Sequence, residues 1–206
     1  MSDYAEIARL GVATMHEAAG RIGIVDLDLV QVVPGSRVAG PARIAVCAPG
    51  DNSMVHAAVA HAVPGDVLVL TLSEPAPVAL IGELLVTQAQ SQGVVGMLVD
   101  GAVRDLDELR AIGLPIWARW VRAQGATKGV VGALDVPIVV GGAPIAPGDL
   151  VIMDCDGVAA LQSESVVRVV PLAVERAERE AAMRERYAAG ELSYDLNGLR
   201  EVVEGT

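Results

Sequence analysis

The sequence predicts an α/β fold for most of the chain. Stretches with helical character alternate with short apolar stretches bounded by Gly and Pro, an order that is typical of α/β domains. Hydrophobic residues make up 52% of the 206 residues, yet Phe is absent and aromatic residues amount to 2%. The core must therefore be built from Val, Leu, Ile and Ala, which suit buried strands and close packing of helices on a sheet.

Turn residues divide the chain into the expected elements. Gly20 and Gly93 follow segments with helical character, and glycine is favoured just past a helix end. Continuous apolar runs are typical of strands that are buried on both faces. Helices are expected at residues 7–19, 83–91 and 106–112, and strands at residues 37–46, 67–70, 94–99, 114–118, 136–140, 150–153, 158–161 and 166–171.

The triplet Pro-Gly-Asp occurs at residues 49–51, 64–66 and 147–149. Pro presets the first φ of a tight turn, and Gly accepts a positive φ at the second position. We therefore interpret the three aspartates primarily as turn residues, with metal binding as the less favoured alternative. The sequence Asp-Cys-Asp-Gly at residues 154–157 lacks the remaining ligands of a calcium loop, and we expect a turn there too.

Composition and charge exclude several classes of function. The net charge of −11 and the pI of about 4.6 leave no basic surface for nucleic acid. No apolar run reaches the ~18 residues of a membrane span, and residues 1–10 lack the apolar region of a signal peptide. Cys47 and Cys155 show no CxxC spacing, so we expect two reduced thiols rather than a disulfide. These features predict a cytoplasmic protein without nucleic-acid or membrane partners.

The composition changes near residue 173. Residues 174–189 are rich in Glu, Arg and Ala and present only a thin apolar face, although i,i+4 ion pairs support a helix. The residues that follow, including Leu192 and Leu199, are too apolar for a free tail. We therefore expect a compact domain at residues 1–172 and a helical arm at residues 173–206 that packs on a neighbouring subunit. A solvated tail is the alternative.

The strongest candidate site is the pair Arg104 and Asp105. It follows the expected buried strand at residues 94–99, across a Gly turn, and precedes the helix at residues 106–112. Ligand sites of α/β sheets lie at the carboxyl ends of strands. The alternative is structural: a local ion pair in which Asp105 caps the next helix.

A second candidate lies at Gly82, Glu83, Leu84 and Leu85, where a helix is expected to start. Free backbone N–H groups at a helix N-terminus bind anions with the help of the helix dipole. The carboxylate of a small oxo acid would fit there, and a cation would explain the nearby acidic side chain of Glu83. The alternative is an ordinary junction of a loop and a helix.

The histidines match no metal-ligand spacing, and we expect each of them on a helix surface or in the core. The three are His16, His56 and His61. The sequence also contains no P-loop, no dinucleotide-binding fingerprint and no recognisable Ser–His–Asp or Cys–His set.

The chain resembles the 4-hydroxy-4-methyl-2-oxoglutarate / 4-carboxy-4-hydroxy-2-oxoadipate aldolases, class II pyruvate aldolases that share a fold with the regulator of ribonuclease activity A proteins. The matching motifs keep their order over nearly the whole chain. They are LGVATMHEA (10–18), APGDN (48–52), PGDVLV (64–69), GELL (82–85), DGAVRD (100–105), WARWVRAQG (117–125), PGDLVIMDCDGV (147–158) and AAGEL (188–192).

The resemblance implies a β/β/α sandwich like the phosphohistidine swivelling domain, assembled as a homotrimer or hexamer with active sites between subunits. It implies that Asp105 is the only direct protein ligand of a divalent metal, Mg²⁺ or Mn²⁺, beside the catalytic Arg104. Substrate-binding amides fall on Gly82 to Leu85. Acidic residues around the metal fall on Glu83 and, from a neighbouring subunit, on Glu17 and Glu180, with Glu178 or Glu175 as alternatives to Glu180.

The implied activity is retro-aldol cleavage of a 4-hydroxy-2-oxo acid to pyruvate and a second oxo acid, with oxaloacetate decarboxylation as a side activity. Arg119 and Arg122 are candidates for holding the distal carboxylate of the substrate. Two other functions stay open: a non-catalytic regulator of ribonuclease activity, and a different lyase that uses the same metal–enolate site.

Overall fold

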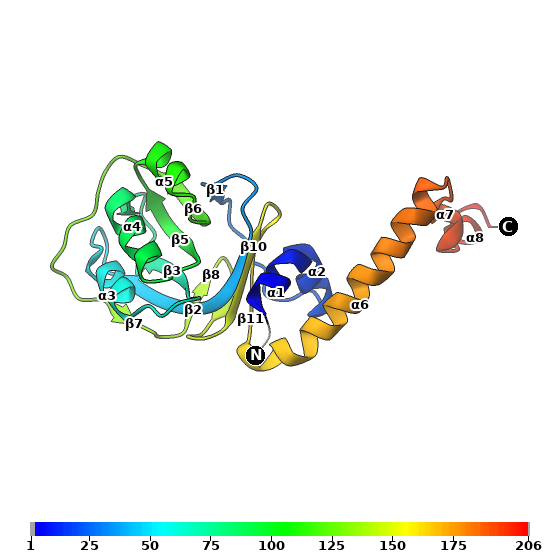
Figure 1. Ribbon diagram of the computed structural model, residues 1–206, viewed down its shortest axis with the longest axis horizontal. Helices are drawn as coiled ribbons and strands as arrows, with labels where there is room; N and C mark the ends of the chain where they lie inside the picture. The colour runs from blue at the N-terminus through cyan, green and yellow to red at the C-terminus, as the bar shows by residue number, and fades with distance from the viewer. Residues whose placement is uncertain (1–2, 206) are drawn as a thin grey trace.

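The computed structural model describes residues 3–205, which form one mixed sheet with helices on both sides and a projecting C-terminal arm (Figure 1). The nine-stranded sheet has the order β1-β6-β5-β3-β2-β10-β11, with β4 paired to β5 and β7 paired to β2, while β8 and β9 form a separate hairpin. The strands are β1 Val30–Gln31, β2 Val38–Cys47, β3 Val67–Leu72, β4 Ala79–Ile81, β5 Gly96–Val103, β6 Ile116–Val121, β7 Ala133–Leu134, β8 Ile138–Val140, β9 Ala143–Ile145, β10 Leu150–Asp154 and β11 Gly157–Leu161. The predicted α/β class is confirmed.

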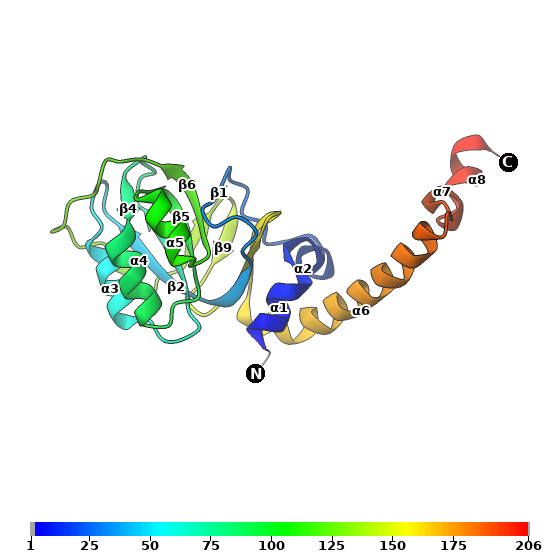
Figure 2. The ribbon, with the colours of Figure 1, turned by 45° about the horizontal axis from the view of Figure 1, so that its top comes forward.

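The centre of the sheet is parallel, because β2, β3, β5 and β6 pair in the same direction. The helices α3 Ser53–His61, α4 Glu83–Ser91 and α5 Leu106–Ile112 cover one face, side by side in both ribbon views (Figures 1 and 2). Their buried side chains share a cluster with alternate residues of the four strands. The expected bounds of α4 and α5 agree with the structure, whereas α3 was not expected.

The opposite face carries a second apolar cluster. Ile44, Val69, Leu98 and Trp117 of the parallel strands pack there against residues of β8 to β11. The parallel strands thus lie between a helical layer and a layer formed by β8 to β11, which is the predicted β/β/α arrangement.

The N-terminal segment differs from the single helix expected at residues 7–19. It forms two helices, α1 Tyr4–Leu10 and α2 Val12–Ala18, separated by Gly11 at φ 83°. The carboxylate of Asp154 accepts a hydrogen bond from the Val12 amide at 2.8 Å, which replaces the partner that a continuous helix would supply. A polar contact with a distant part of the chain therefore accompanies the break between the two helices.

The strand expected at residues 166–171 is wrong. This segment belongs to α6 Ser163–Ala188, a helix of 26 residues. Its Val residues favour strands, but Val166, Val169, Val170 and Ala173 recur at helical spacing and pack with α1, α2, β10 and β11. The boundary proposed after residue 172 falls inside this helix and stays a prediction.

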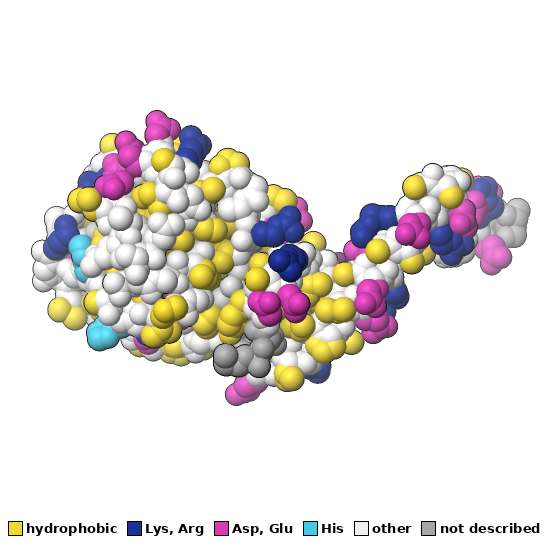
Figure 3. Space-filling model, viewed as in Figure 1, with side chains coloured by type: hydrophobic (Ala, Val, Ile, Leu, Met, Phe, Trp, Pro, Cys, Tyr) yellow, Lys and Arg dark blue, Asp and Glu magenta, His cyan; other side chains and the backbone are white. Residues whose placement is uncertain are grey.

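Beyond Ala173, α6 leads away from the compact body and ends in α7 Ser193–Leu196 and α8 Leu199–Glu204 (Figures 1 and 2). Neither α7 nor α8 has a buried residue. Figure 3 shows charged side chains of both signs along this arm. No helix within residues 3–205 is long and apolar enough to cross a membrane.

The turn interpretation of the Pro-Gly-Asp triplets is confirmed. The carboxylate of Asp66 accepts the Val63 amide at 3.0 Å, and that of Asp149 accepts the Ala146 amide at 2.8 Å, so each closes its own turn. Asp51 likewise accepts the amide of Ser53. Residues 155 and 156 form the expected turn between β10 and β11, and both cysteines are free.

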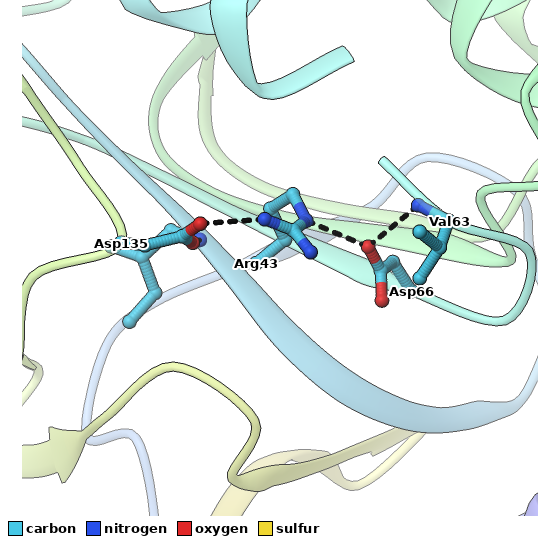
Figure 4. A network of polar contacts seen from close by, with 5 residues as sticks. Arg43, Val63, Asp66 and Asp135 are labelled. Carbon is cyan, nitrogen blue, oxygen red and sulfur yellow. Dashed lines mark hydrogen bonds and ion pairs between the residues drawn. The ribbon is translucent and has the colours of Figure 1, made fainter. Parts of the chain in front are cut away.

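Arg43 of β2 joins two loops to the sheet, and one of them is the Pro-Gly-Asp turn at residues 64–66 (Figure 4). Its Nε donates to Asp66 at 2.8 Å, and its Nη1 donates to Asp135, which precedes β8. These two carboxylates raise the pKa of Arg43, with the hydrogen bond to Asp66 as the largest cause. The pair holds both loops against the same strand.

We expect Arg43→Met to lower the free energy of unfolding by about 2–4 kcal/mol, because it leaves a buried carboxylate without its cation. The Asp66 side chain is only 5% exposed. Urea unfolding followed by circular dichroism measures the loss. The control is Arg179→Met, which removes an exposed i,i+4 pair with Glu175 and should cost at most about 0.5 kcal/mol. Equal losses in the two variants would contradict a structural role for Arg43.

Candidate active site

A cavity of about 430 Å³ opens where β4 and β5 end and where α4 and α5 begin. Its lining includes Gly82, Arg104 and Asp105, together with His56 of α3. The parallel pairing of β4 with β5 sets Ile81 beside Val103, so the residues that follow each strand meet at the same edge of the sheet. The two candidate sites expected from the sequence are therefore one site.

Asp105 is held in an uncommon backbone conformation, with φ 60° and ψ 47°. Its side chain makes no capping hydrogen bond to α5; instead Oδ2 accepts the amide of Glu83 at 3.0 Å. The capping role in the structural alternative is therefore wrong, whereas its ion pair with Arg104 is present. A left-handed Asp is strained by about 1 kcal/mol or more, and such strain is found most often at functional sites.

Arg104 lies directly against this carboxylate, with Nε 3.5 Å from Oδ2 of Asp105. Two glycines make room for the pair. A Cβ on Gly82 would stand 2.3 Å from Oδ2 of Asp105, and a Cβ on Gly125 would stand 2.6 Å from Nη1 of Arg104. The sequence uses glycine here for close approach, since neither residue has a positive φ.

The acidic group of Asp105 fits a hard divalent cation. Its side chain is 39% exposed, and only Oδ2 is engaged by the Glu83 amide, so Oδ1 can bind a ligand from the cavity. One carboxylate with open surroundings suits Mg²⁺ or Mn²⁺, which keep several water or substrate ligands. The cluster Asp154, Cys155 and Asp156 is a poorer candidate, because both oxygens of Asp154 already accept backbone amides.

The N-terminus of α4 faces the same cavity. The amide of Glu83 is engaged by Asp105, while helix geometry leaves those of Leu84 and Leu85 without an intrahelical acceptor. Both residues line the cavity, and Leu84 is 80% exposed. An anion at this end of the cavity would therefore meet the amides of Leu84 and Leu85, a narrower set than the sequence suggested.

Two other predicted residues lie elsewhere in the subunit. Glu17 of α2 and Glu180 of α6 both approach Arg176, whose Nη1 is 3.9 Å from Glu17 and whose Nε is 2.9 Å from Glu180. Arg21, which hydrogen-bonds Glu17, lowers the pKa of that carboxyl most, and Arg176 contributes. The structure thus brings these acids together with each other, but not with Asp105 of the same chain.

Four polar residues that line the cavity had no role predicted from the sequence: Asn52, His56, Glu108 and Lys128. His56 lies on helix α3, in keeping with the expected place on a helix, and its side chain also lines the cavity. Burial, and to a lesser degree Lys128, hold the pKa of His56 below its usual value, while Asp51 opposes them. The sequence contained one signal for this part of the site: Lys128 is the only lysine in the chain.

The two arginines proposed for a distal carboxylate do not line this cavity. Arg119 pairs with Asp100 at 3.0 Å and stacks on Trp120. Arg122 lines a neighbouring hollow that also includes Arg104 and Asp105.

Burial raises the pKa of the Cys47 thiol to about 11, so this thiol is a poor candidate for a nucleophile.

Comparison with known families identifies the group to which this site belongs. The family model described as RraA-like, Aldolase/RraA, matches residues 3–160. The chain belongs to this Aldolase/RraA family. The matched residues include all those that line the cavity, Arg104 and Asp105 among them.

Individual relatives agree with this assignment. A Halalkalibacterium halodurans protein named "Putative 4-hydroxy-4-methyl-2-oxoglutarate aldolase" is 38% identical over 135 residues, which cover 64% of each chain. An uncharacterised Methanocaldococcus jannaschii protein, MJ0644, is 30% identical and is covered to 58%. The chain thus spans less than two thirds of the length of these relatives.

Comparison with solved structures shows that the similarity includes the fold. Streptomyces coelicolor RraAS2, titled a member of the RNase ES inhibitor RraA protein family, matches with TM-score 0.76 and 26% identity over 89% of this chain and 98% of that one. An uncharacterised Pseudomonas syringae protein matches with TM-score 0.82 at 24% identity, covering 93% and 92% of the two chains. The second likeness shows the fold alone.

We expect Gly82→Ala to weaken Mn²⁺ binding about tenfold or more, since disturbing the partners of a metal ligand costs that much. The added Cβ would collide with Oδ2 of Asp105. Calorimetry or electron paramagnetic resonance measures the affinity, and a thermal melt reports folding. Gly125→Ala should lose less, because it meets only the flexible end of Arg104. Mn²⁺ affinity within twofold of wild type in Gly82→Ala would exclude Asp105 as the ligand.

Proposed function

We propose that the protein is a metal-dependent pyruvate aldolase, which cleaves a 4-hydroxy-2-oxo acid to pyruvate and a second oxo acid. The observation that carries the proposal is the fixed group of Arg104, Asp105 and the α4 amides around one cavity. The relative named as an aldolase supports it. These residues support that reaction class, because the site offers a cation, a side chain that suits a divalent metal and backbone amides that suit a carboxylate.

A divalent metal would be held by Asp105 and, when bound, would act as a Lewis acid toward the 2-oxo group of the substrate. The amides of Leu84 and Leu85 would bind the C1 carboxylate at the N-terminus of α4. That placement brings the 2-oxo group over Arg104. The guanidinium group can then stabilise negative charge as it develops on the 2-oxo oxygen, an effect usually worth several kcal/mol.

The chemistry is a balanced retro-aldol step. A carboxylate at the site accepts the proton of the C4 hydroxyl group, directly or through water, and the C3–C4 bond breaks as the new carbonyl forms. The bonding electrons become the enolate of pyruvate, and a proton delivered to C3 completes pyruvate. Glu83, at the cavity edge, is the candidate for proton transfer within the chain. Oxaloacetate would reach the same enolate by losing carbon dioxide.

We also infer that the active site is shared between subunits of a homotrimer or hexamer. Glu17 and Glu180 share Arg176 at one patch, and that patch lies on the helices α2 and α6. A heterologous contact would bring this patch to the cavity of the next subunit and close into a ring. The two acids would then assist Glu83 in proton transfer.

Regulation of a ribonuclease is the second candidate function. Its support is the structural likeness to RraAS2 and to the Thermus protein titled an RNA-processing inhibitor, which matches with TM-score 0.64 at 25% identity over 78% of this chain and 93% of that one. Pyruvate release separates the two functions, since a regulator needs no turnover.

The metal requirement gives the first test. Dialysis against EDTA should abolish pyruvate release from 4-hydroxy-4-methyl-2-oxoglutarate, and added Mg²⁺ or Mn²⁺ should restore it. The reason is that the metal held by Asp105 would activate the oxo acid. Coupling to lactate dehydrogenase measures pyruvate. Full activity of the metal-free protein would overturn the mechanism, and no activity under any condition would favour the regulator.

The shared site predicts recovery from two inactive variants. Asp105→Ala and Glu180→Ala spoil opposite sides of each subunit contact. The two variants are unfolded and refolded together. Random mixing should then restore about one site in four, because a working site needs an intact Asp105 in one subunit and an intact Glu180 in its neighbour. Pyruvate release by the mixture measures the recovery.

The controls are refolded wild type and each variant alone, which must be inactive and still oligomeric. Recovery near one quarter of wild type supports the shared site. No recovery, against good recovery of wild type, would place Glu180 outside the neighbour's site.

A further inference from the structure

The patch formed by Glu17, Arg176 and Glu180 lies where α6 leaves the compact body. Both ribbon views place α2 beside this part of α6 (Figures 1 and 2). Ala173 is the last buried residue of α6, and Arg176 follows within one turn, with its side chain 35% exposed. Arg176 thus stands at the boundary between the part of α6 that packs on the body and the part that projects from it.

Two carboxylates from different helices converge on this one guanidinium group. Nη1 of Arg176 is 3.9 Å from Oε2 of Glu17, and Nε is 2.9 Å from Oε1 of Glu180. The Nε–H group makes no hydrogen bond within residues 3–205, so its contact with Glu180 is an ion pair without a well-directed hydrogen bond. Charge rather than hydrogen-bond geometry therefore joins the two acids to Arg176.

Arg21 makes a second contact with Glu17. Its Nε donates to Oε2 of Glu17 at 3.1 Å, the same oxygen that Arg176 approaches. The backbone of Arg21 is left-handed, with φ 65°. That conformation is strained for a residue with a side chain, and such strain is found most often at functional sites. Glu17 therefore has two cationic partners on one oxygen, and one of them is held in a strained conformation.

Each acid keeps one oxygen outside these contacts. The hydrogen bonds and ion pairs in the described part of the chain use Oε2 of Glu17 and Oε1 of Glu180. Oε1 of Glu17 and Oε2 of Glu180 can therefore accept a proton or a hydrogen bond from another molecule. Without a cation between them, two neighbouring carboxylates repel each other, and they either separate or take up a proton.

We propose that Arg176 is a positioning residue, which holds Glu17 and Glu180 together as a preformed pair of carboxylates with one free oxygen each. Removal of its charge would let the pair separate and would favour the protonated form of Glu17. The use of the pair for proton transfer rests on the proposed shared active site, whereas the pairing itself does not. Arg176 acts through the two acids and would touch no substrate.

The charges around Glu17 determine the direction of the expected change. The hydrogen bond from Arg21 lowers the pKa of Glu17 most, and burial opposes this effect. The charges of Arg21, Arg176 and His16 lower the pKa further. Because the pKa of Glu17 lies below its usual value, loss of the Arg176 charge should raise it. Glu17 would then take up its proton at a higher pH.

Carbodiimide labelling distinguishes the two acids and needs no catalysis. The reagent couples an added amine to protonated carboxyl groups, so the rate falls as a carboxyl group ionises. Trypsin cleaves after arginine, and Glu17 is the only acidic residue of peptide 10–21, while Glu180 is the only one of peptide 180–184. Replacement of Arg176 leaves both peptides intact. Mass spectrometry over a pH series therefore gives the labelling rate of each acid.

In Arg176→Met, the midpoint pH of Glu17 labelling should rise by about 0.5 unit, less than the ~1–3 units of a close pair because the contact is 3.9 Å long. Glu180 should label faster, since its carboxylate loses its cation. Arg176→Lys keeps the charge and should stay closer to wild type than Arg176→Met. A merely looser arm would change the rates at every pH without moving the midpoint.

The matched control is Arg186→Met, which removes an exposed ion pair with Glu191 farther along the arm. It leaves both tryptic peptides intact and should change neither labelling curve. An unchanged midpoint for Glu17 in Arg176→Met, or an equal shift in Arg186→Met, overturns the proposal.

Turnover gives the second measurement. In Arg176→Met, the acid limb of the pH profile of kcat for pyruvate release should move to higher pH, because proton acceptors must be ionised. KM should change less than about twofold, since Arg176 touches no substrate. A fall in kcat and in Tm without a shift of the acid limb would make Arg176 structural and overturn its positioning role. If the Glu17 midpoint shifts but no substrate releases pyruvate, the proposed reaction fails and the pairing stands.

Discussion

The hydrogen bond from the Glu83 amide to the Asp105 carboxylate joins the two halves of the site. It connects the first residue of α4 to the residue before α5, and so fixes the directions in which both helices leave the sheet. Only a residue without a Cβ at position 82 allows this approach. The left-handed backbone at Asp105 turns the carboxylate back toward α4 rather than onto its own helix. The candidate anion site and the candidate metal site thereby share one cavity.

The remaining walls depend on the same parallel sheet. Ala79 of β4 accepts the amide of Ala126, and the turn before α3 holds Thr127, so the loop that carries Lys128 is tied to both neighbouring elements. The consequence is electrostatic. The chain has a net charge of −11, which repels an anionic substrate at long range, yet Arg104 and Lys128 both border the cavity. Binding of an anionic substrate would therefore depend on contacts inside the site, where screening by salt is weak.

The sequence predicted the elements that local chemistry determines. Gly82 and Gly113 mark the start of α4 and the end of α5, and both helices have the expected bounds. The sequence failed where tertiary contacts override local preference: Val-rich residues 166–171 are helical because α1 and α2 cover them. Arg104 and Asp105 could be found because they follow a buried strand. Asn52 and Lys128 could not, since 76 residues separate them in the sequence and only loop-to-loop hydrogen bonds bring them together.

Within one subunit, the cavity and the Glu17–Arg176–Glu180 patch belong to different parts of the molecule. This separation is the physical argument for an arm that docks on another subunit. A helix whose buried residues end at Ala173 gains little from its own domain. Leu192, Leu199, Val202 and Val203 at its end are exposed, and covering such apolar side chains would lower the free energy of the protein in water. Docking on another subunit would cover these side chains and, by the same movement, carry two carboxylates toward a cavity that needs proton acceptors. Assembly and completion of the active site would then be one event, which links turnover to oligomer formation.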